Sequence, residues 1–225
     1  MRILVLGKGK TGSLVAEIAA ERGHVVQAVD EIENANGAAL TAGKLAGVDV
    51  VIDFTAPAAA VANITAVLEN GGRIGVGTTG WYEHLPALKA LAAGKQGALL
   101  YGTNFSIGVQ KLFQMTAELA ALEGYSFSIE ETHHVTKRDA PSGTAITLKQ
   151  IILEKQPGAE IEITSHRIAD AKGEHVVRAS NAIDELEVRH NATSRRGFAL
   201  GAVRAAEWAA DKRGNWEFRE IFPLL

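Results

Sequence analysis

The sequence contains no cysteine, few aromatic residues and no long apolar run. The absence of cysteine excludes disulfides, thiolate nucleophiles and sulfur-ligated clusters within the chain, and it is consistent with a reducing compartment. No stretch is apolar for long enough to cross a bilayer, and Met1 leads directly into a short apolar segment and a glycine loop, unlike a signal peptide. These absences predict a cytoplasmic location and no membrane partner.

Neither sign of charge predominates, because 23 basic residues nearly balance 26 acidic ones and the net charge is −3. Nucleic acid is therefore not an expected partner. Aromatic residues make up only 6% of the chain, whereas it has 23 glycines and many alanines, which suits helices packed closely on a sheet. A length of 225 residues accommodates one large domain or two small ones.

The first motif along the chain is a glycine-rich loop, Gly7–Gly12, which lies between a strand-like and a helix-like segment. Arg2–Leu6 is nearly all apolar, as in a strand buried on both faces, and Ser13–Glu21 has apolar residues at helical spacing. A second apolar segment, Val25–Val29, ends just before an acid that lies 18 residues after the last glycine of the motif, where an acid bonds a ribose hydroxyl in dinucleotide-binding folds. A glycine motif alone is a weak signal, but the complete unit predicts a dinucleotide site formed by Gly7, Lys8, Gly9, Lys10, Thr11, Gly12 and Asp30.

The alternation of strands and helices continues to about residue 101. Strands are expected at 48–54, 73–76 and 98–101, and helices at 57–69 and 84–93. Such a pattern predicts a parallel sheet with right-handed crossovers, whose ligands lie beyond the carboxyl ends of the strands. A single polar turn there would be ordinary, but three together predict a nicotinamide and ribose pocket: Asp53-Phe54-Thr55, then Gly77, Thr78, Thr79 and Gly80, then Gly102, Thr103, Asn104 and Phe105.

Two pairs of charges bear on the choice of cofactor. Asp30 and Glu31 would repel a 2′-phosphate, which favours NADH over NADPH. Lys8 and Lys10 would attract that phosphate if they are not simply solvated surface charges. The sequence predicts use of both cofactors with NADH preferred.

A second chemically rich region, residues 130–145, joins an alternating strand-like segment to the start of a helix. Ser142 and Thr144 are candidate caps for that helix. Backbone N–H groups at Gly143 and Thr144, at the positive end of the helix dipole, would attract a carboxylate or a phosphate. The region therefore predicts a site for an anionic small molecule.

Proton transfer is the second property expected of this region. Lys137 adds a cation, and His133 or His134 adds a group that exchanges protons near neutral pH. The two histidines point to opposite faces if the strand continues, so one of them is expected in the pocket. An ordinary solvated loop is the alternative interpretation. No metal is expected, since the carboxylates and histidines lack a recognised zinc spacing.

In this order the motifs resemble the dihydrodipicolinate reductase family of the diaminopimelate–lysine pathway, whose activity is that of a 4-hydroxy-tetrahydrodipicolinate reductase. The resemblance spans essentially the whole chain. It rests on the glycine loop, on the three polar turns, and above all on Glu131-Thr132-His133-His134, Lys137, Asp139 and Pro141-Ser142-Gly143-Thr144-Ala145, with further support from Ala192–Phe198 and Gly201–Arg204.

The resemblance implies an α/β fold of two domains. Residues 1–105 and 197–225 would form a Rossmann dinucleotide-binding domain, to which the last helix, 197–211, returns with Phe198, Leu200, Val203 and Trp208 facing the sheet. Residues 106–196 would form a mixed-sheet α+β domain for substrate binding and oligomerisation. Family members usually form homotetramers through these sheets, so the strand near Glu187–His190 is expected at an interface.

The resemblance also implies the reaction, which is NAD(P)H-dependent reduction of 4-hydroxy-tetrahydrodipicolinate to tetrahydrodipicolinate with loss of water. One carboxylate of this small dicarboxylate substrate would bind at Ser142, Gly143 and Thr144, with His134 and Lys137 holding or neutralising it. His133 matches the general acid of the family and Lys137 a supporting donor. Neither a metal nor a covalent intermediate is required.

The chain differs from the family pattern at two places, and two alternative functions remain to be considered. Many members carry basic residues where this chain has Val135 and Thr136, and this chain has little between Asp30 and Val48. An amino-acid or oxo-acid dehydrogenase on the same scaffold is one rival, since one Rossmann module serves many substrates. A non-catalytic dinucleotide sensor is the other, and it would need the glycine loop but not Lys137, His133 and the anion site at the helix start together.

Overall fold

The computed structural model describes residues 1–225, which divide into two compact units. Unit 1 comprises Met1–Ile107 together with Arg196–Leu225, and unit 2 comprises Gly108–Arg195. None of the helices combines the length and the apolar composition that crossing a membrane would require. The α/β fold class expected from the sequence is confirmed.

Unit 1 is built on a six-stranded sheet in the order β10-β5-β4-β3-β1-β2, with every neighbouring pair parallel. The strand order reverses at β1, so the loops after β1 and β3 lie side by side at the carboxyl edge of the sheet, the usual ligand edge of such folds. The strands are β1 (Arg2–Leu6), β2 (Val25–Val29), β3 (Val50–Asp53), β4 (Arg73–Val76), β5 (Ala98–Tyr101) and β10 (Gly214–Glu217).

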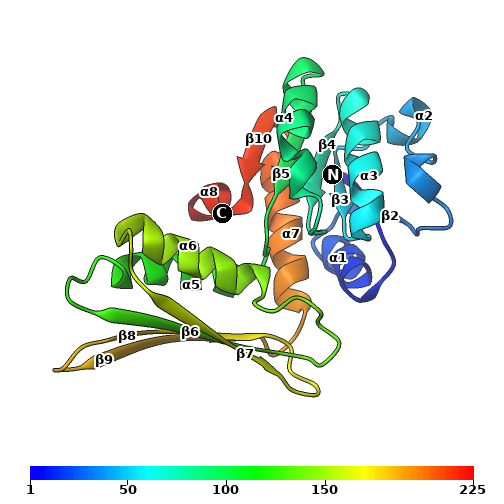
Figure 1. Ribbon diagram of the computed structural model, residues 1–225. Helices are drawn as coiled ribbons and strands as arrows, with labels where there is room; N and C mark the ends of the chain where they lie inside the picture. Colours follow the sequence, from blue (N-terminus) through cyan, green and yellow to red (C-terminus); the bar gives the residue numbers. More distant parts are fainter. The chain divides into compact units, whose positions relative to one another are not determined.

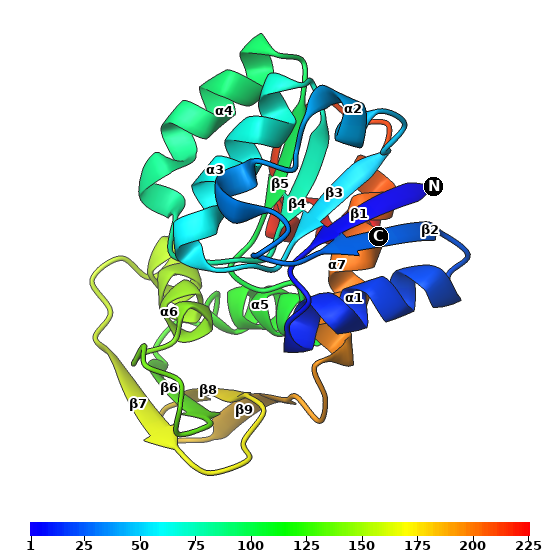
Figure 2. The same ribbon diagram turned by 90° about the vertical axis from the view of Figure 1, so that its right-hand side faces the viewer.

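Helices cover both faces of this sheet (Figures 1 and 2). One apolar cluster contains Ile3 and Val5 of β1 with residues of α1 and α7, and a second contains Leu4 and Leu6 with residues of α3 and α4. The two sets alternate along β1 because successive side chains of a strand point to opposite faces. The helices are α1 (Lys10–Glu21), α3 (Pro57–Glu69), α4 (Leu85–Gly94) and α7 (Arg196–Ala209).

Several elements of unit 1 differ from the sequence-based expectation. Helix α1 begins at Lys10, three residues earlier than expected, because the glycine motif itself supplies its N-cap at Gly9. Short elements without clear periodicity were not predicted: η1 (Ala35–Gly37), α2 (Ala42–Leu45), η2 (Tyr82–His84), β10, α8 (Phe218–Ile221) and η3 (Phe222–Leu224).

The inner face of α7 also differs from the expected one. Val203 is fully buried as predicted, but Leu200 and Trp208 are half-buried at the margin of the cluster and Phe198 lies outside it. The face packed on the sheet consists mainly of small residues instead, namely Ala199, Ala202, Ala205, Ala206 and Ala209. A Cβ at Gly201 would stand 1.7 Å from the carbonyl oxygen of Phe105, so close packing of this helix requires small side chains.

Unit 2 is a four-stranded mixed sheet in the order β7-β6-β8-β9, in which β6 and β7 are parallel and the other pairs antiparallel. Helices α5 (Ile107–Leu119) and α6 (Gly143–Lys155) share one apolar cluster with one face of the sheet (Figure 1). The strands are β6 (Ser126–His133), β7 (Ile161–Arg167), β8 (Glu174–Ser180) and β9 (Glu185–Asn191).

The period-two pattern of β6 carries two ionisable residues into the interior of unit 2. Phe127, Ile129, Glu131 and His133 are buried, whereas the residues between them are partly exposed. Since alternate residues share a face, Glu131 and His133 lie on the same side as the apolar core of this unit.

Candidate active site

The glycine loop of unit 1 has the geometry of a phosphate-binding turn. Gly7 has a φ of +96°, and a Cβ on it would stand 2.3 Å from the carbonyl oxygen of Phe54. A Cβ on Gly12 would stand 1.9 Å from the carbonyl oxygen of Gly7, whereas one on Gly9 would meet nothing within 4 Å. The first and third glycines therefore permit tight packing, and the second leaves open space at the N-terminus of α1, where a pyrophosphate group can approach the backbone.

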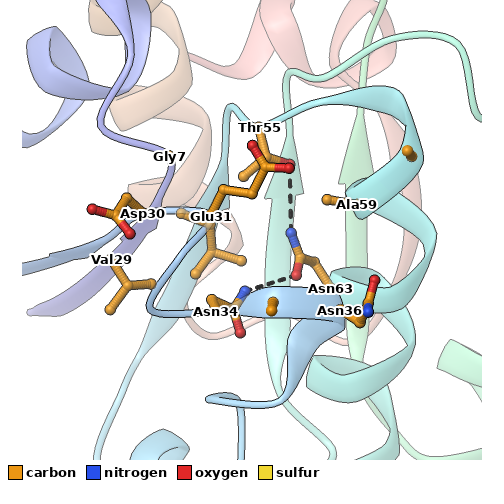
Figure 3. Close-up of a pocket in the computed structure, with 12 residues that line it drawn as sticks. Gly7, Val29, Asp30, Glu31, Asn34, Asn36, Thr55, Ala59 and Asn63 are labelled. Atoms are coloured by element: carbon orange, nitrogen blue, oxygen red, sulfur yellow. Dashed lines mark hydrogen bonds between the residues drawn. The ribbon is translucent and has the colours of Figure 1, made fainter.

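Beside this loop lies a cavity of about 260 Å³, lined in part by Gly7, Asp30, Asn34, Thr55 and Asn63 (Figure 3). The structure thus brings Gly7, Asp30 and Thr55, all predicted from the sequence, to one pocket. No sequence motif pointed to Asn34 or Asn63. Their side chains meet through a hydrogen bond of 2.8 Å from Asn34 Nδ2 to Asn63 Oδ1, although the residues are 29 positions apart.

Lys8 of the glycine loop is held by two carboxylates. Its Nζ lies 2.5 Å from Glu33 Oε2 and 3.7 Å from Asp30 Oδ2. The backbone N–H groups of Ile32 and Glu33 donate to Asp30 Oδ1, and the bond from Glu33 is the main reason that the pKa of Asp30 lies below its ordinary value. The hydrogen bond to Glu33 likewise raises the pKa of Lys8. This lysine is therefore a compensated charge and not an isolated surface cation.

A buried polar network underlies the cavity. Asp53 is fully buried and accepts from Thr78 Oγ1 at 2.7 Å and from Asn63 Nδ2 at 2.8 Å. Thr78 Oγ1 also accepts from the Thr55 N–H at 2.8 Å. The hydroxyl of Thr78, predicted as a cofactor ligand, is thus engaged within the protein, while the neighbouring Thr79 is exposed.

Other predicted cofactor residues have evident packing roles. A Cβ on Gly77 would stand 2.2 Å from the ring of Phe54, and one on Gly102 would stand 2.9 Å from Phe218 Cβ. Phe105 is buried and its ring stacks on that of Phe218 with centroids 4.6 Å apart. Between them, Thr103 and Asn104 are half-exposed, and Asn104 Oδ1 accepts from the Ser106 N–H at 2.8 Å.

In unit 2 the buried carboxylate of Glu131 contacts Nδ1 of His133. Its other oxygen accepts from Arg167 Nη2 at 3.0 Å. Burial acts to raise the pKa of Glu131, but hydrogen bonds from Ser165 and Arg167 hold that pKa below its ordinary value, so the carboxylate stays ionised. Burial lowers the pKa of His133 despite the neighbouring carboxylate, and the positive charge of Lys137 acts in the same direction.

A second buried histidine, His175, connects the Glu131–His133 pair to helix α6. His175 of β8 lies directly opposite Glu131 in the sheet, and its ring meets that of His133 edge-on with centroids 5.0 Å apart. Its Nε2 lies 3.2 Å from Ser142 Oγ, which also accepts from the Ala145 N–H as the N-cap of α6. Ser142 is therefore a buried cap, as its sequence position predicted, and His175 was missed.

The N-terminus of α6 offers an anion site. Gly143, its first residue, is exposed, and a Cβ there would meet nothing within 4 Å. Thr144 follows and is buried. N–H groups in the first turn of a helix point along the axis with the positive end of the dipole, so this end attracts a carboxylate.

The remaining predicted residues lie in the loop between β6 and α6. Lys137 Nζ donates to Asp139 Oδ2 at 2.8 Å. Burial acts to raise the pKa of Asp139, but the lysine holds it below its ordinary value. His134 Nδ1 lies 2.7 Å from Thr136 Oγ1, and its ring is half-buried while that of His133 is buried. His133 is thus the histidine that enters the interior.

Glu131, His133 and His175 also present potential metal ligands, with one atom from each lying within 4.8 Å of the others. The same carboxylate is already compensated by Arg167, and Lys137 adds a further positive charge nearby. The cluster therefore has the charge balance of an acid–base site more than that of a divalent cation site.

Two descriptions of one family match the chain, one over each part of it. Residues 1–105 match the family described as "Dihydrodipicolinate reductase, N-terminus", and residues 108–222 match "Dihydrodipicolinate reductase, C-terminus". The 4-hydroxy-tetrahydrodipicolinate reductase of Christiangramia forsetii is 38% identical, with 100% of this chain and 99% of the relative covered. That of Natronomonas pharaonis is 35% identical over 96% of this chain and 97% of the relative.

Solved structures show the same fold. A dipicolinate-bound dihydrodipicolinate reductase from Paenisporosarcina sp. TG-14 has a TM-score of 0.80 at 22% identity, covering 100% of this chain and 99% of the other. An amine dehydrogenase from Mycobacterium smegmatis has a TM-score of 0.70 at 12% identity over 97% and 95% of the two chains. The fold is thus shared with other dehydrogenases, but the sequence matches are specific: the chain belongs to the dihydrodipicolinate reductase family.

Proposed function

We propose that this protein catalyses the NAD(P)H-dependent reduction of 4-hydroxy-tetrahydrodipicolinate to tetrahydrodipicolinate in the diaminopimelate route to lysine. Family membership over both halves of the chain supports the reaction. The observation that carries the chemistry is the buried contact of His133 with an ionised carboxylate, in the same unit as the exposed N-terminus of α6. This arrangement provides a proton donor and an anion site.

Unit 1 fits a dinucleotide. The open space at Gly9 suits the pyrophosphate. The cavity beside Asp30 lies where the adenosine ribose is expected to bind. Thr79, Thr103 and the other exposed polar groups of the neighbouring turns would contact the nicotinamide end. When bound, the reduced nicotinamide supplies a hydride. The carboxylates of Asp30 and Glu33 support a preference for NADH, with NADPH also used.

Unit 2 would bind and protonate the substrate. One substrate carboxylate would accept from the backbone at Gly143 and Thr144, beside the cap Ser142. His134 and Lys137, in the loop that precedes α6, would neutralise the charge of the dianionic substrate. In the overall reaction the substrate gains a hydride and a proton and its hydroxyl leaves as water.

His133 would deliver the proton. Because its Nδ1 faces the Glu131 carboxylate, Nε2 is the atom that exchanges a proton with the substrate. Burial makes its imidazolium a stronger acid than a free one, and arrival of a dianion favours its protonation. General acid catalysis of this kind contributes roughly 10²–10⁴-fold to a rate.

A homotetramer built through unit 2 is part of the proposal. The edge strand β9 is largely exposed, and exposed apolar side chains occur at Leu186 on it and at Ile183 just before it. An unpaired edge with apolar neighbours is suited to association with another copy. Light scattering coupled to size-exclusion chromatography tests the number of subunits directly.

A coupled assay tests the reaction. A synthase supplied with pyruvate and aspartate semialdehyde generates the substrate in situ, and the absorbance of reduced nicotinamide is followed. Consumption that depends on all components supports the proposal. Binding of NADH without consumption would favour the sensor, and consumption with amino acids or oxo acids instead would favour a dehydrogenase of another specificity.

A further inference from the structure

We propose that Glu131 is a positioning residue for His133, holding its imidazole by Nδ1 so that Nε2 alone delivers the proton, with Arg167 anchoring the carboxylate. This inference rests on the proposed function of His133. It assigns a role to a carboxylate that is buried in unit 2 with no exposed surface.

The surroundings of Glu131 explain how a buried carboxylate keeps its charge. Arg167, on the parallel neighbour β7, donates from Nη2 at 3.0 Å. Ser165 on the same strand lies opposite Glu131 and helps to keep the pKa of its carboxylate low. Arg167 is itself held by the carbonyl oxygens of His166, at 2.6 Å, and Asp139, at 2.5 Å. A carboxylate oriented in this way has a fixed direction from which to contact an imidazole.

The tautomer of His133 follows from that contact. A carboxylate oxygen only accepts hydrogen bonds, so the ring nitrogen that faces it must carry a proton. The neutral ring then has Nδ1–H and a lone pair on Nε2, and the imidazolium has its transferable proton on Nε2. The carboxylate favours the imidazolium and so partly offsets its burial.

Gly173 lies beside the Nε2 edge of the His133 ring. A Cβ on Gly173 would stand 3.3 Å from His133 Nε2, so any side chain at this position would crowd the atom that has to reach the substrate. Gly173 also has a φ of +134°, a conformation that other residues rarely adopt. The glycine therefore complements the carboxylate: Nδ1 contacts Glu131, and no side chain at position 173 crowds Nε2.

The wild-type protein provides the first test. Nitrogen-15 NMR of the histidines, at a pH above the pKa of His133, distinguishes a protonated ring nitrogen from one with a lone pair. We expect the Nδ1–H form for His133. A neutral ring with its proton on Nε2 would overturn the proposal, whether or not the protein reduces the proposed substrate.

Glu131→Gln and its neighbour Glu130→Gln form a matched pair for the second test. Glu130 is also a carboxylate of β6, but it lies on the opposite face and pairs with Arg178 at 2.9 Å. We expect Glu131→Gln to lower kcat by about 10²-fold, with KM changed only a few-fold, and Glu130→Gln to behave as wild type.

The pH profile separates positioning from mere stability. Without the carboxylate the imidazolium is less favoured, so the loss of kcat with rising pH should move to lower pH in Glu131→Gln alone. Equal kcat and equal pH profiles for the two variants would overturn the proposal. If the wild-type protein proves inactive, the proposed reaction fails, and the tautomer of His133 in wild type and in Glu131→Gln still decides the role of Glu131.

Discussion

The ammonium of Lys8 lies 2.5 Å from the carboxylate of Glu33 and 3.7 Å from that of Asp30. One of the two lysines of the glycine loop is thus neutralised by carboxylates of the segment that follows β2. Because both carboxylates would also repel a 2′-phosphate, this contact supports the proposed preference for NADH.

Glu33→Gln should release Lys8 and shift the preference towards NADPH. We expect kcat/KM for NADPH to rise about two- to fivefold relative to NADH, as for loss of one exposed ion pair. Glu31→Gln is the matched control, because it removes an equal charge nearby but leaves the contact of Lys8 with Glu33 intact. If both variants shift the ratio equally, general electrostatics and not the release of Lys8 sets the preference.

Alanine variants of two glycines in the loop should distinguish a packing role from a role in cofactor binding. Gly12→Ala places a Cβ 1.9 Å from the carbonyl oxygen of Gly7 and should destabilise the protein by about 1–3 kcal/mol. Gly9→Ala meets no protein atom within 4 Å and should lower the unfolding temperature less than Gly12→Ala, by the small cost of alanine at an N-cap, while weakening NADH binding. Thermal unfolding and NADH titration of the two variants check this contrast. Unchanged NADH affinity in Gly9→Ala would argue against a pyrophosphate at this position.

Two adjacent threonines should behave differently. Thr78→Val removes the hydroxyl that donates to Asp53 and accepts from the Thr55 N–H, so two hydrogen bonds are lost, and it should destabilise the protein by about 1–3 kcal/mol. The exposed Thr79→Val should leave stability unchanged and reduce kcat/KM for the cofactor. Urea unfolding and steady-state kinetics measure the two effects, and equal unfolding midpoints for Thr78→Val and wild type would remove the structural role of this hydroxyl.

Stability should fall with acidification through His175. Burial lowers the pKa of this histidine to about 3, whereas the unfolded chain has the ordinary value of 6.5. Between pH 3 and pH 6.5 the unfolded state therefore binds more protons than the folded state. The stability that is present above pH 6.5 is lost as the pH falls towards 3, by at most about 1.4 kcal/mol per pH unit for this group.

Urea unfolding at pH 7, 6 and 5 checks this prediction. His175→Gln should reduce the pH dependence, and the exposed His84→Gln should retain that of wild type. Identical slopes in wild type and His175→Gln would show that the buried imidazole is not the source. His133 and His190 also have pKa values lowered by burial, so part of the dependence should remain in His175→Gln.

The features that the sequence predicted correctly are those with local signals. The glycine spacing located the turn from β1 into α1, and the alternation of β6 placed His133 at the end of a strand. The N-cap at Ser142 was likewise recognisable from its own neighbours, because a cap bonds a backbone N–H three residues ahead.

The partners that sequence reasoning missed depend on register between distant segments. His175 meets Glu131 only because β6 and β8 pair antiparallel at this position, and Arg167 reaches the same carboxylate from β7. The contact of Asn34 with Asn63 similarly joins a loop after β2 to α3. On α7, Val203, Leu200 and Trp208 pack on the cluster as expected. Phe198 lies outside it, and most of the fully buried residues are alanines, because close packing selects small side chains over the large apolar ones that periodicity favours.

The most direct measurement compares turnover with cofactor affinity in His133→Gln, using substrate generated in situ. We expect kcat to fall by roughly 10²–10⁴-fold with an NADH Kd close to that of wild type, since the proposed role of His133 is proton delivery and the residue belongs to unit 2. A variant that turns over like wild type, or one that loses NADH binding while retaining kcat, would contradict it.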